Sequence, residues 1–201
     1  VTDGNGCIST ATTVITEPTL LTHTFATVNV HCFGGSTGAI TINPAGGTPG
    51  YTYLWTPGSY TTQTITGLPA GTYTCVYTDA NGCQKTGTVT ITQPAGMVLT
   101  STQVDATCNM ANGSATVAVT GGTGPYSYSW STVPVQTTIT ATGLPSNTYV
   151  VTVTDTNTCT QTLAVTINNL AGPVATVFSV NNVSCFGDND GSATVTVSGG
   201  T

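Results

Sequence analysis

Hydrophobic and polar residues alternate along most of this chain, so that every second side chain of many short segments is apolar. In the segment 38–43 the alternation places Ile40 and Ile42 on one face, and in the segment 51–55 it aligns three aromatic side chains. A period of two residues is typical of a half-buried β-strand. Glycine- and proline-rich stretches such as "GGTPG" and "DANG" separate the segments, as turns separate antiparallel strands. No stretch has the period of a helix, and the pattern therefore predicts an all-β protein.

The predicted strands return at an interval of about 76 residues, which is within the range of repeat architectures. Asp79 and Asp155 occupy the same place in two related stretches, "LPAGTYTCVYTDANGC" and "LPSNTYVVTVTDTNTC", and they are separated by this interval. Such a period indicates a tandem repeat, which we expect to be part of a longer array. The sequence divides into the C-terminal strands of a preceding repeat (1–18), two full repeats (19–94 and 95–171) and the N-terminal strands of a following repeat (172–201).

Two features favour an immunoglobulin-like sandwich for each full repeat. A tryptophan, Trp55 or Trp130, ends the predicted third strand, where such sandwiches bury one against the opposite sheet. The stretches "LPAGTY" and "LPSNTY" end on Tyr73 and Tyr149, and both resemble a tyrosine corner. With six or seven antiparallel strands per repeat, the sequence predicts tandem immunoglobulin-like antiparallel β-sandwiches of about 76 residues, with these four aromatic side chains in their cores.

Six of the seven cysteines occupy two repeated positions, and repeated pairs of cysteines indicate an oxidising compartment. The first position follows the first strand and the second precedes the last strand. The residues are Cys32, Cys108 and Cys185 at the first position and Cys7, Cys83 and Cys159 at the second. The remaining one, Cys75, faces inward by the alternation and is expected to be an inert buried thiol.

Two pairing schemes for these cysteines stay open, because spacing alone does not determine connectivity. In the first, which we expect, each full repeat is closed by its own disulfide and the two outermost cysteines pair outside the sequence. The predicted bridges are then Cys32–Cys83 and Cys108–Cys159, with Cys7 and Cys185 paired elsewhere. In the second scheme the bridges cross the junctions, as Cys7–Cys32, Cys83–Cys108 and Cys159–Cys185.

Charged residues make up only 4% of the chain, and their scarcity excludes several functions. Lys85 is the single lysine or arginine against seven acidic residues, so the formal net charge is −6. Nucleic-acid binding requires a basic surface, and we expect none. No apolar run approaches the roughly 20 residues of a membrane-spanning helix, so we expect no membrane insertion by this part of the protein. No acid–base pair recurs in both full repeats, and we expect no enzymatic activity.

One aspartate recurs in every copy, and an asparagine follows it two residues later. Asp3, Asp79 and Asp155 are therefore expected to form Asx-type turns at the end of a strand. The alternative is a calcium site, for which Asp188 and Asp190 of "GDNDG" are further candidate ligands. Calcium takes six to eight oxygen ligands, which is more than these loops offer, so we expect no cofactor. The spacings of zinc sites, CxxC and HxxxH, are absent.

The stretches "VHCFGGSTGAITI", "VSCFGDNDGSATVTVSGGT", "GGTGPYSYSWS" and "GLPAGTYTCVYTDANGC" together resemble the SprB-type repeats of very large cell-surface adhesins of Bacteroidota, some of which act in gliding motility. The resemblance covers essentially the whole sequence. It implies an extracellular protein of the bacterial cell surface, in which the repeats form an adhesin stalk or a filament that mediates adhesion or spacing. Its partners would be neighbouring repeats and identical chains in a fibre.

The alternative function is an array of modules that bind a carbohydrate or another surface polymer. Tyr51, Tyr53 and Trp55 lie on one face of a predicted strand, and aromatic faces stack on sugar rings. The corresponding "YSYSW" of the second repeat has only serines on its other face, which favours packing of the aromatic face in the core. Surface glycans therefore remain the alternative partner.

Overall fold

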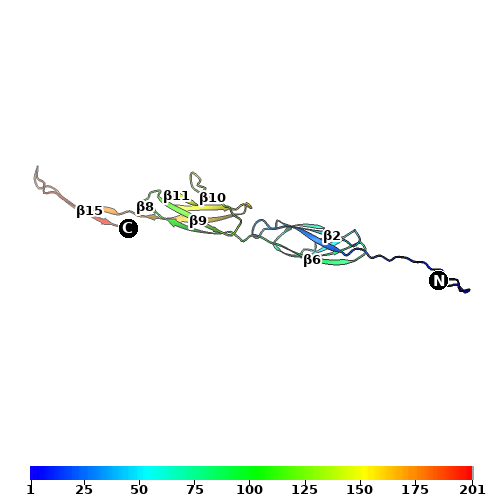
Figure 1. Cartoon of the computed structure of the whole chain (residues 1–201). Coiled ribbons are helices and arrows are strands. Elements are labelled where there is room, and N and C mark those ends of the chain that lie inside the picture. Colours follow the sequence, from blue (N-terminus) through cyan, green and yellow to red (C-terminus); the bar gives the residue numbers. More distant parts are fainter. Residues whose placement is uncertain (201) are drawn as a thin grey trace. The chain divides into compact units, whose positions relative to one another are not determined.

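The computed structural model describes residues 1–200 as strands and connecting loops (Figure 1). The chain forms two compact units, Val1–Gln93 and Pro94–Thr201, and each is described here by itself. The described residues contain no helix, and hence no helix that is long and apolar enough to cross a membrane.

The first unit is a sandwich of two three-stranded antiparallel sheets. One sheet has the order β1-β2-β4 and the other has the order β3-β5-β6. The strands are β1 (Thr22–Val28), β2 (Gly38–Ala45), β3 (Thr52–Thr56), β4 (Thr64–Leu68), β5 (Gly71–Thr78) and β6 (Gln84–Ile91). This is the strand order of the two sheets of an immunoglobulin-like domain, in a small form with three strands on each side.

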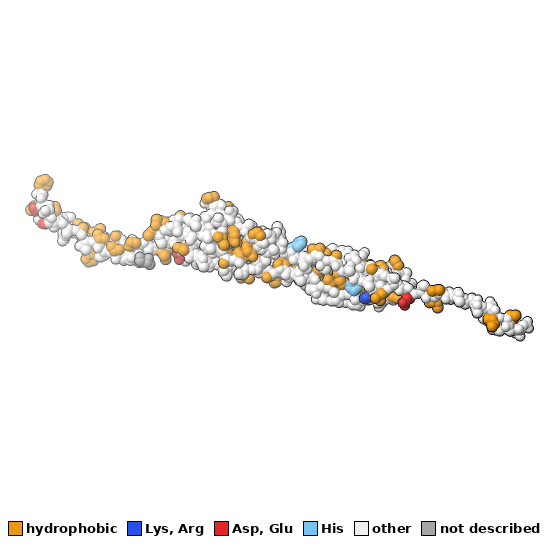
Figure 2. All heavy atoms as spheres, viewed as in Figure 1, with side chains coloured by type: hydrophobic (Ala, Val, Ile, Leu, Met, Phe, Trp, Pro, Cys, Tyr) orange, Lys and Arg blue, Asp and Glu red, His pale blue; other side chains and the backbone are white. Residues whose placement is uncertain are grey.

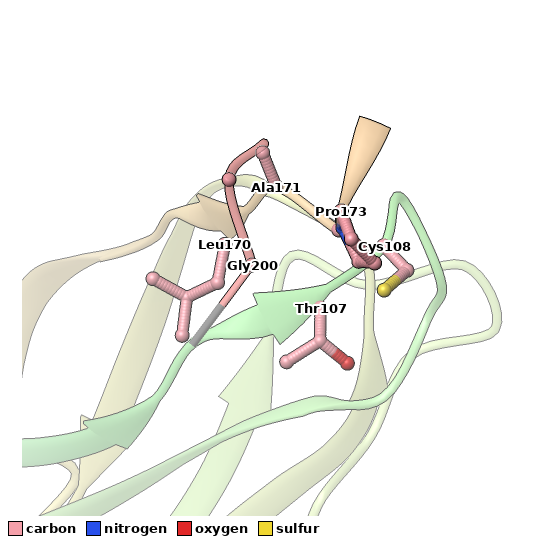
Figure 3. Close-up of a pocket in the computed structure, with 8 residues that line it drawn as sticks. Thr107, Cys108, Leu170, Ala171, Pro173 and Gly200 are labelled. Carbon is pink, nitrogen blue, oxygen red and sulfur yellow. The ribbon is translucent and has the colours of Figure 1, made fainter. Parts of the chain in front are cut away.

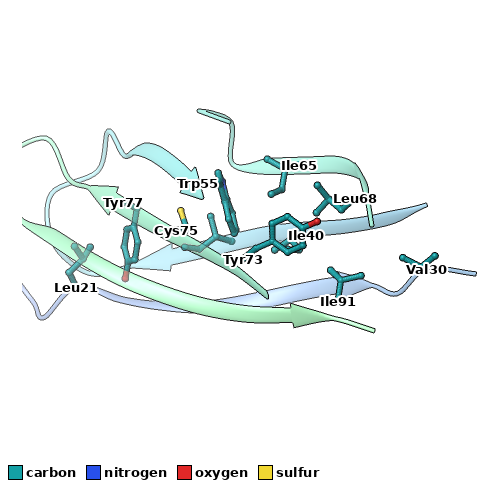
Figure 4. Close-up of a cluster of buried hydrophobic side chains, with 11 residues drawn as sticks. Leu21, Val30, Ile40, Trp55, Ile65, Leu68, Tyr73, Cys75, Tyr77 and Ile91 are labelled. Carbon is teal, nitrogen blue, oxygen red and sulfur yellow. The ribbon is translucent and has the colours of Figure 1, made fainter. Parts of the chain in front are cut away.

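The alternating apolar residues of both sheets meet between them and form the core of the first unit (Figure 4). Strand β2 contributes Ile40 and Ile42, and strand β5 contributes Tyr73, Cys75 and Tyr77, all less than 5% exposed. The other buried members are Leu21, Val30, Trp55, Ile65, Leu68 and Ile91. The residues between them, Thr41, Thr74 and Val76, are only partly buried, so the period of two in the sequence is the period of burial in the sandwich.

The second unit repeats this sandwich with the same strand order. Its sheets are β11-β9-β7 and β10-β12-β13. The strands are β7 (Val98–Val104), β9 (Gly113–Thr120), β10 (Ser127–Trp130), β11 (Thr140–Leu144), β12 (Asn147–Thr154) and β13 (Thr160–Ile167). Two short strands, β8 (Ala106–Thr107) and β14 (Asn169–Leu170), pair in parallel beside them.

The last described residues form a separate hairpin of β15 (Val174–Asn181) and β16 (Ser192–Ser198). Every side chain of both strands is exposed. The hairpin corresponds to the first two strands of a repeat, which have no opposite sheet to pack on within the described residues. The predicted fold class, tandem immunoglobulin-like antiparallel β-sandwiches, is confirmed.

Tryptophan and tyrosine fix the interior of each sandwich. Trp55 and Trp130 are 0% and 1% exposed, and each indole Nε1 donates to a backbone carbonyl, of Thr62 at 3.0 Å and of Thr138 at 2.9 Å. A buried indole N–H needs such an acceptor, and both repeats supply it from the connection that leads to the next strand.

The tyrosine corner forms in both repeats. Tyr73 Oη donates to the Pro69 carbonyl oxygen at 3.0 Å, and Tyr149 Oη donates to the Pro145 carbonyl oxygen at 3.0 Å. The backbone turns just before each proline at a glycine with φ of 71° (Gly67) or 66°, a conformation that other residues rarely adopt. The corner therefore fixes the passage from one sheet to the other.

Candidate functional site

A buried aspartate organises one end of each sandwich. Asp79 follows β5 and is 5% exposed. Its Oδ1 accepts hydrogen bonds from the backbone N–H groups of Asn81 at 3.0 Å and Cys83 at 2.8 Å, and its Oδ2 accepts one from Thr48 N at 2.9 Å. The carboxylate thus closes its own turn and ties that turn to the loop between β2 and β3.

The second repeat builds the same site with the same geometry. Asp155 accepts from the backbone N–H groups of Asn157 at 2.9 Å, Cys159 at 2.9 Å and Thr123 at 3.0 Å. The N-terminal segment has the two bonds within the turn, in which Asp3 accepts from the backbone N–H groups of Asn5 and Cys7. This is the Asx-type turn expected from the sequence, extended by a third bond to a distant loop.

These hydrogen bonds favour the charged carboxylate. The bond from the Thr48 backbone, together with those from Cys83 and Asn81, lowers the pKa of Asp79 below its ordinary value. The three bonds from Thr48, Asn81 and Cys83 N–H groups come from backbone donors, so the carboxylate acts as a structural clamp at this end of the repeat.

Asp188 and Asp190 lie in the loop between β15 and β16 and converge on one serine. Ser184 Oγ lies 2.6 Å from Asp190 Oδ2 and 3.0 Å from Asp188 Oδ2, and Ser184 N donates to Asp190 Oδ1 at 3.0 Å. The bond from the Ser184 hydroxyl lowers the pKa of Asp190. Two carboxylates and a hydroxyl supply fewer oxygens than calcium takes, and residues 1–200 hold no group of three His, Cys, Asp or Glu suited to a metal ion.

The two repeated cysteine positions lie at opposite ends of the sandwich. Cys83 belongs to the Asp79 turn, which lies beside the residues where the chain enters the repeat, because Gly47 N donates to the Thr19 carbonyl oxygen. Cys32 lies in the loop after β1, where the chain leaves the repeat. There, Val30 N donates to a backbone oxygen of the exit segment, that of Thr92, at 2.9 Å.

The predicted within-repeat disulfides are wrong. Cys32 and Cys159 are disulfide-bonded, whereas Cys83 and Cys108 are free thiols. The eight residues of β6 separate the two ends of the first repeat, a distance of about 25 Å at roughly 3.3 Å per residue. A disulfide requires Cα atoms within about 7 Å of each other.

The alternative scheme is wrong as well. Each junction pair that it proposes contains at least one cysteine that is free, namely Cys7, Cys83, Cys108 or Cys185. The four free cysteines of the repeated positions are exposed, whereas Cys75 is buried in the core opposite Trp55. Burial raises the pKa of the Cys75 thiol to about 11, which suppresses its thiolate and its reactivity.

The aromatic side chains considered for sugar binding are engaged in the sandwich. Trp55 is fully buried, and Tyr51 and Tyr53 are partly buried against the same core. Tyr51 Oη donates to the Gly46 carbonyl oxygen at 2.6 Å, and its counterpart Tyr126 makes the same bond to the Gly121 oxygen. Their rings therefore pack as part of the fold.

A hollow of about 330 Å³ lies at the exit end of the second repeat (Figure 3). Its lining consists of Thr107, Cys108, Leu170, Ala171, Gly172, Pro173, Gly199 and Gly200. It contains no charged side chain, and the Cys108 thiol lies at its edge. On the face shown in Figure 2, charged side chains are few among the hydrophobic and uncharged ones.

Comparison with known proteins finds one family that matches the chain at three places. The SprB repeat family matches three segments of the chain, residues 24–60, 100–135 and 177–201. Each match begins in the first strand of a repeat, so the matches follow the same register as the strands. No curated protein matches the sequence.

The chain also matches solved structures at low sequence identity. An amphioxus IgVJ-C2 molecule is 13% identical over 72% of this chain and 96% of that chain, with a TM-score of 0.32. Dpr2 Ig1-Ig2 in complex with DIP-Theta Ig1-Ig3 is 11% identical over 79% of this chain and 70% of that chain, with a TM-score of 0.31.

Proposed function

The chain carries SprB repeats, and on that premise we propose that it is a structural segment of an adhesin stalk or filament on the surface of a bacterial cell. The repeats would space an adhesive part of the protein away from the cell. SprB repeats belong to cell-surface proteins, and a disulfide fits a compartment outside the reducing cytoplasm.

The observation that carries this proposal is the path of the chain through one repeat. The chain enters the first repeat at the Asp79 end, where Gly47 N donates to the Thr19 carbonyl oxygen at 2.7 Å. It leaves at the opposite end, where Thr92 accepts from Val30 N. A repeat that takes the chain in at one end and releases it at the other adds its own length to an array, as a stalk requires.

The side chains that recur in both repeats support the same role. The indole of Trp55, the tyrosine corner of Tyr73 and the carboxylate of Asp79 each hold backbone segments together, and each has a counterpart in the second repeat. These recurrent polar groups are engaged in maintaining the sandwich. They are the expected features of a module selected for shape.

The proposal is tested by adding a repeat and measuring length. Strands of eight residues span about 26 Å, so a repeat with its turns is expected to add roughly 30–40 Å to an array. Small-angle X-ray scattering would compare the full chain with a version that carries a second copy of residues 95–171. A maximum dimension that grows by this expected length supports a stalk.

Growth by less than half of the expected length would mean that the repeats pack side by side, and it would contradict the stalk. A glycan array probed with the full chain tests the other function. Saturable binding at micromolar protein would favour the carbohydrate-binding module instead.

A further inference from the structure

A buried tyrosine of the first repeat depends on a histidine for its hydrogen bond. Tyr77 is fully buried at the end of the core where Leu21 also lies (Figure 4). Its Oη lies 3.0 Å from Nδ1 of His23, a partly buried residue of β1. Within residues 1–200 this nitrogen is the only hydrogen-bond partner of the Tyr77 hydroxyl. A buried hydroxyl without a partner destabilises a fold, so the repeat depends on this bond between β1 and β5.

The bond requires a neutral imidazole. Burial, and then the neighbouring Cys75 and Tyr51, raise the pKa of Tyr77, so its hydroxyl keeps a proton that needs an acceptor. Nδ1 of His23 accepts only while it carries no proton itself. When Nδ1 takes up a proton from solvent it becomes a donor, and the hydroxyl proton of Tyr77 is then left without an acceptor in the core.

The side chains packed around His23 carry no negative charge. The ring of Phe25, on the same strand, lies 4.9 Å from the imidazole between centroids, and the ring of Tyr77 lies 5.3 Å away. Gly87 of β6 leaves the space that the imidazole occupies, because a Cβ there would meet its Nε2. The β2 residue that pairs with His23 is Pro44. None of these neighbours stabilises an imidazolium as a carboxylate would.

The charged group that acts on His23 has the same sign as a protonated imidazole. Lys85 lies on β6, and its Nζ donates to the Leu21 carbonyl oxygen at 2.9 Å, which holds the ammonium group near the start of β1. Burial, and then the charge of Lys85, lower the pKa of His23 below its ordinary value of 6.5. The hydrogen bond, the packing and the charge therefore all oppose protonation in the folded repeat.

We propose that protonation of His23 breaks the bond between β1 and β5 and makes the first repeat lose stability in mildly acid solution, a response that the second repeat lacks. In the second repeat the counterparts of His23, Tyr77 and Lys85 are Leu99, Val153 and Gln161. None of these three side chains titrates. A stalk segment needs no response to pH, so this inference goes beyond the proposed function.

The direction of the response follows from the linkage between protonation and folding. Above pH 6.5 the imidazole of His23 is neutral in the folded and the unfolded chain, and it makes stability independent of pH. As the pH falls below 6.5, the unfolded chain takes up the proton first, because the pKa in the folded chain is lower. Stability is therefore lost as the pH falls toward the lowered pKa. One proton changes the unfolding equilibrium constant by at most about tenfold per pH unit.

Urea unfolding of the full chain at several pH values tests this response. Trp130→Phe leaves Trp55 as the only tryptophan, so that its fluorescence reports on the first repeat. We expect the unfolding equilibrium constant to rise as the pH is lowered from 7.5 to 5.5, by up to about tenfold per unit. The chain with Trp55→Phe, in which Trp130 reports on the second repeat, should show no such rise. A flat response of the first repeat, or an equal rise in both, would overturn the proposal.

Two variants identify the group that titrates. His23→Asn keeps an acceptor near the position of Nδ1 and does not titrate, so the rise should be lost. The matched control is His31→Asn, because His31 is the other histidine of the sequence and lies exposed in the loop after β1. The control should keep the rise, since histidine is the side chain that ordinarily titrates in this range. A rise that persists in His23→Asn, or disappears in His31→Asn, would contradict the assignment.

Proton NMR measures the same property without unfolding and does not need His23→Asn to fold. In full-length His31→Asn the remaining histidine signal belongs to His23, and its Cε1–H chemical shift follows protonation. We expect a midpoint below pH 6.5, and Tyr77→Phe in the same chain should raise this midpoint, because it removes the hydroxyl that favours the neutral imidazole. A midpoint at or above 6.5, or one that Tyr77→Phe leaves unchanged, would show that the bond does not control His23.

Discussion

The path of the chain through each sandwich predicts that no disulfide closes a repeat on itself. Cys32 and Cys83 lie at opposite ends of the first sandwich, and Cys83 and Cys108 are free thiols. A bridge from Cys32 to Cys83, or from Cys108 to Cys159, would enclose about 51 residues and shorten the unfolded contour by about 180 Å, because an extended chain spans about 3.5 Å per residue. Optical tweezers attached to the two ends of the full chain, with and without dithiothreitol, measure such a shortening directly.

The size of any shortening identifies the enclosed segment. We expect no shortening of about 180 Å in the oxidised protein, and Cys83→Ser should behave as the unmodified chain. A shortening of about 180 Å that Cys83→Ser or Cys108→Ser abolishes would refute the placement of the two cysteines at opposite ends of a repeat.

The remaining predictions concern the stability of the first sandwich, measured by urea unfolding followed by circular dichroism. Trp55→Ala should lower the free energy of unfolding by about 3–5 kcal/mol because the indole fills the core. Leu54→Ala, a half-exposed neighbour, should change it by less than about 0.5 kcal/mol, and a similar loss in both variants would contradict the core assignment. Tyr73→Phe should cost about 0.5–1.5 kcal/mol by removing the corner hydrogen bond, and no loss would show that this bond is dispensable. Since the pKa of Asp79 is lowered in the folded protein, the charged carboxylate stabilises the fold above pH 3.8, its ordinary pKa, and this stabilisation is lost as the pH falls through the lowered pKa. Asp79→Asn should therefore reduce the loss of folding stability at acid pH. An unchanged loss would contradict this role of the carboxylate. Gly87→Leu should destabilise the repeat, because a side chain there would meet the imidazole that lies above it, and a stability equal to that of the unmodified chain would contradict this packing.

The core of each sandwich was predictable from the sequence because it depends on local alternation. Ile40, Ile42 and Trp55 lie inward because every second residue of a strand faces the same way. The tyrosine corner was predictable for a related reason, since its hydrogen bond joins two residues that are close in the sequence, Pro69 and Tyr73. Features that depend on a short stretch of chain can be derived from that stretch.

The different sizes of the side chains that pack between the first and last strands of the two repeats were not predictable. In the first repeat His23 and Phe25 lie over Gly87, where an added Cβ would come within 2.3 Å of the imidazole and 2.7 Å of the phenyl ring. In the second repeat the residue that corresponds to Gly87 is Leu163, and the residue that corresponds to His23 is Leu99. Both leucines pack against the core of their sandwich. The side chain at the position of Gly87 is larger in the second repeat, and the side chain at the position of Phe25, which is Ser101, is smaller. The two strands are far apart in the sequence, so the pattern of either strand alone does not show this exchange.

The disulfide predictions failed because of one connection. If all six strands were joined by hairpins, the end of the first strand and the start of the sixth would lie at the same end of the sandwich, and a bridge from Cys32 to Cys83 would be short. In the structure the connection from β3 to β4 passes between the sheets without reversing direction. Both strands run toward the exit, since Thr52 pairs with Thr78 at the entry end and Leu68 pairs with Gly38 at the exit end.

Compared with a chain of six strands joined by hairpins, the connection from β3 to β4 reverses the direction of β4, β5 and β6. Strand β6 consequently runs the same way as β1, the chain leaves at the end opposite its entry, and Cys83 lies at the entry end. The connection that makes a repeat extend an array is therefore also the one that prevents its two cysteines from pairing with each other. A repeat with this path takes the chain in at one end, releases it at the other and leaves one cysteine at each end. The length that each repeat adds to the chain and the separation of its two cysteines thus follow from the same topology.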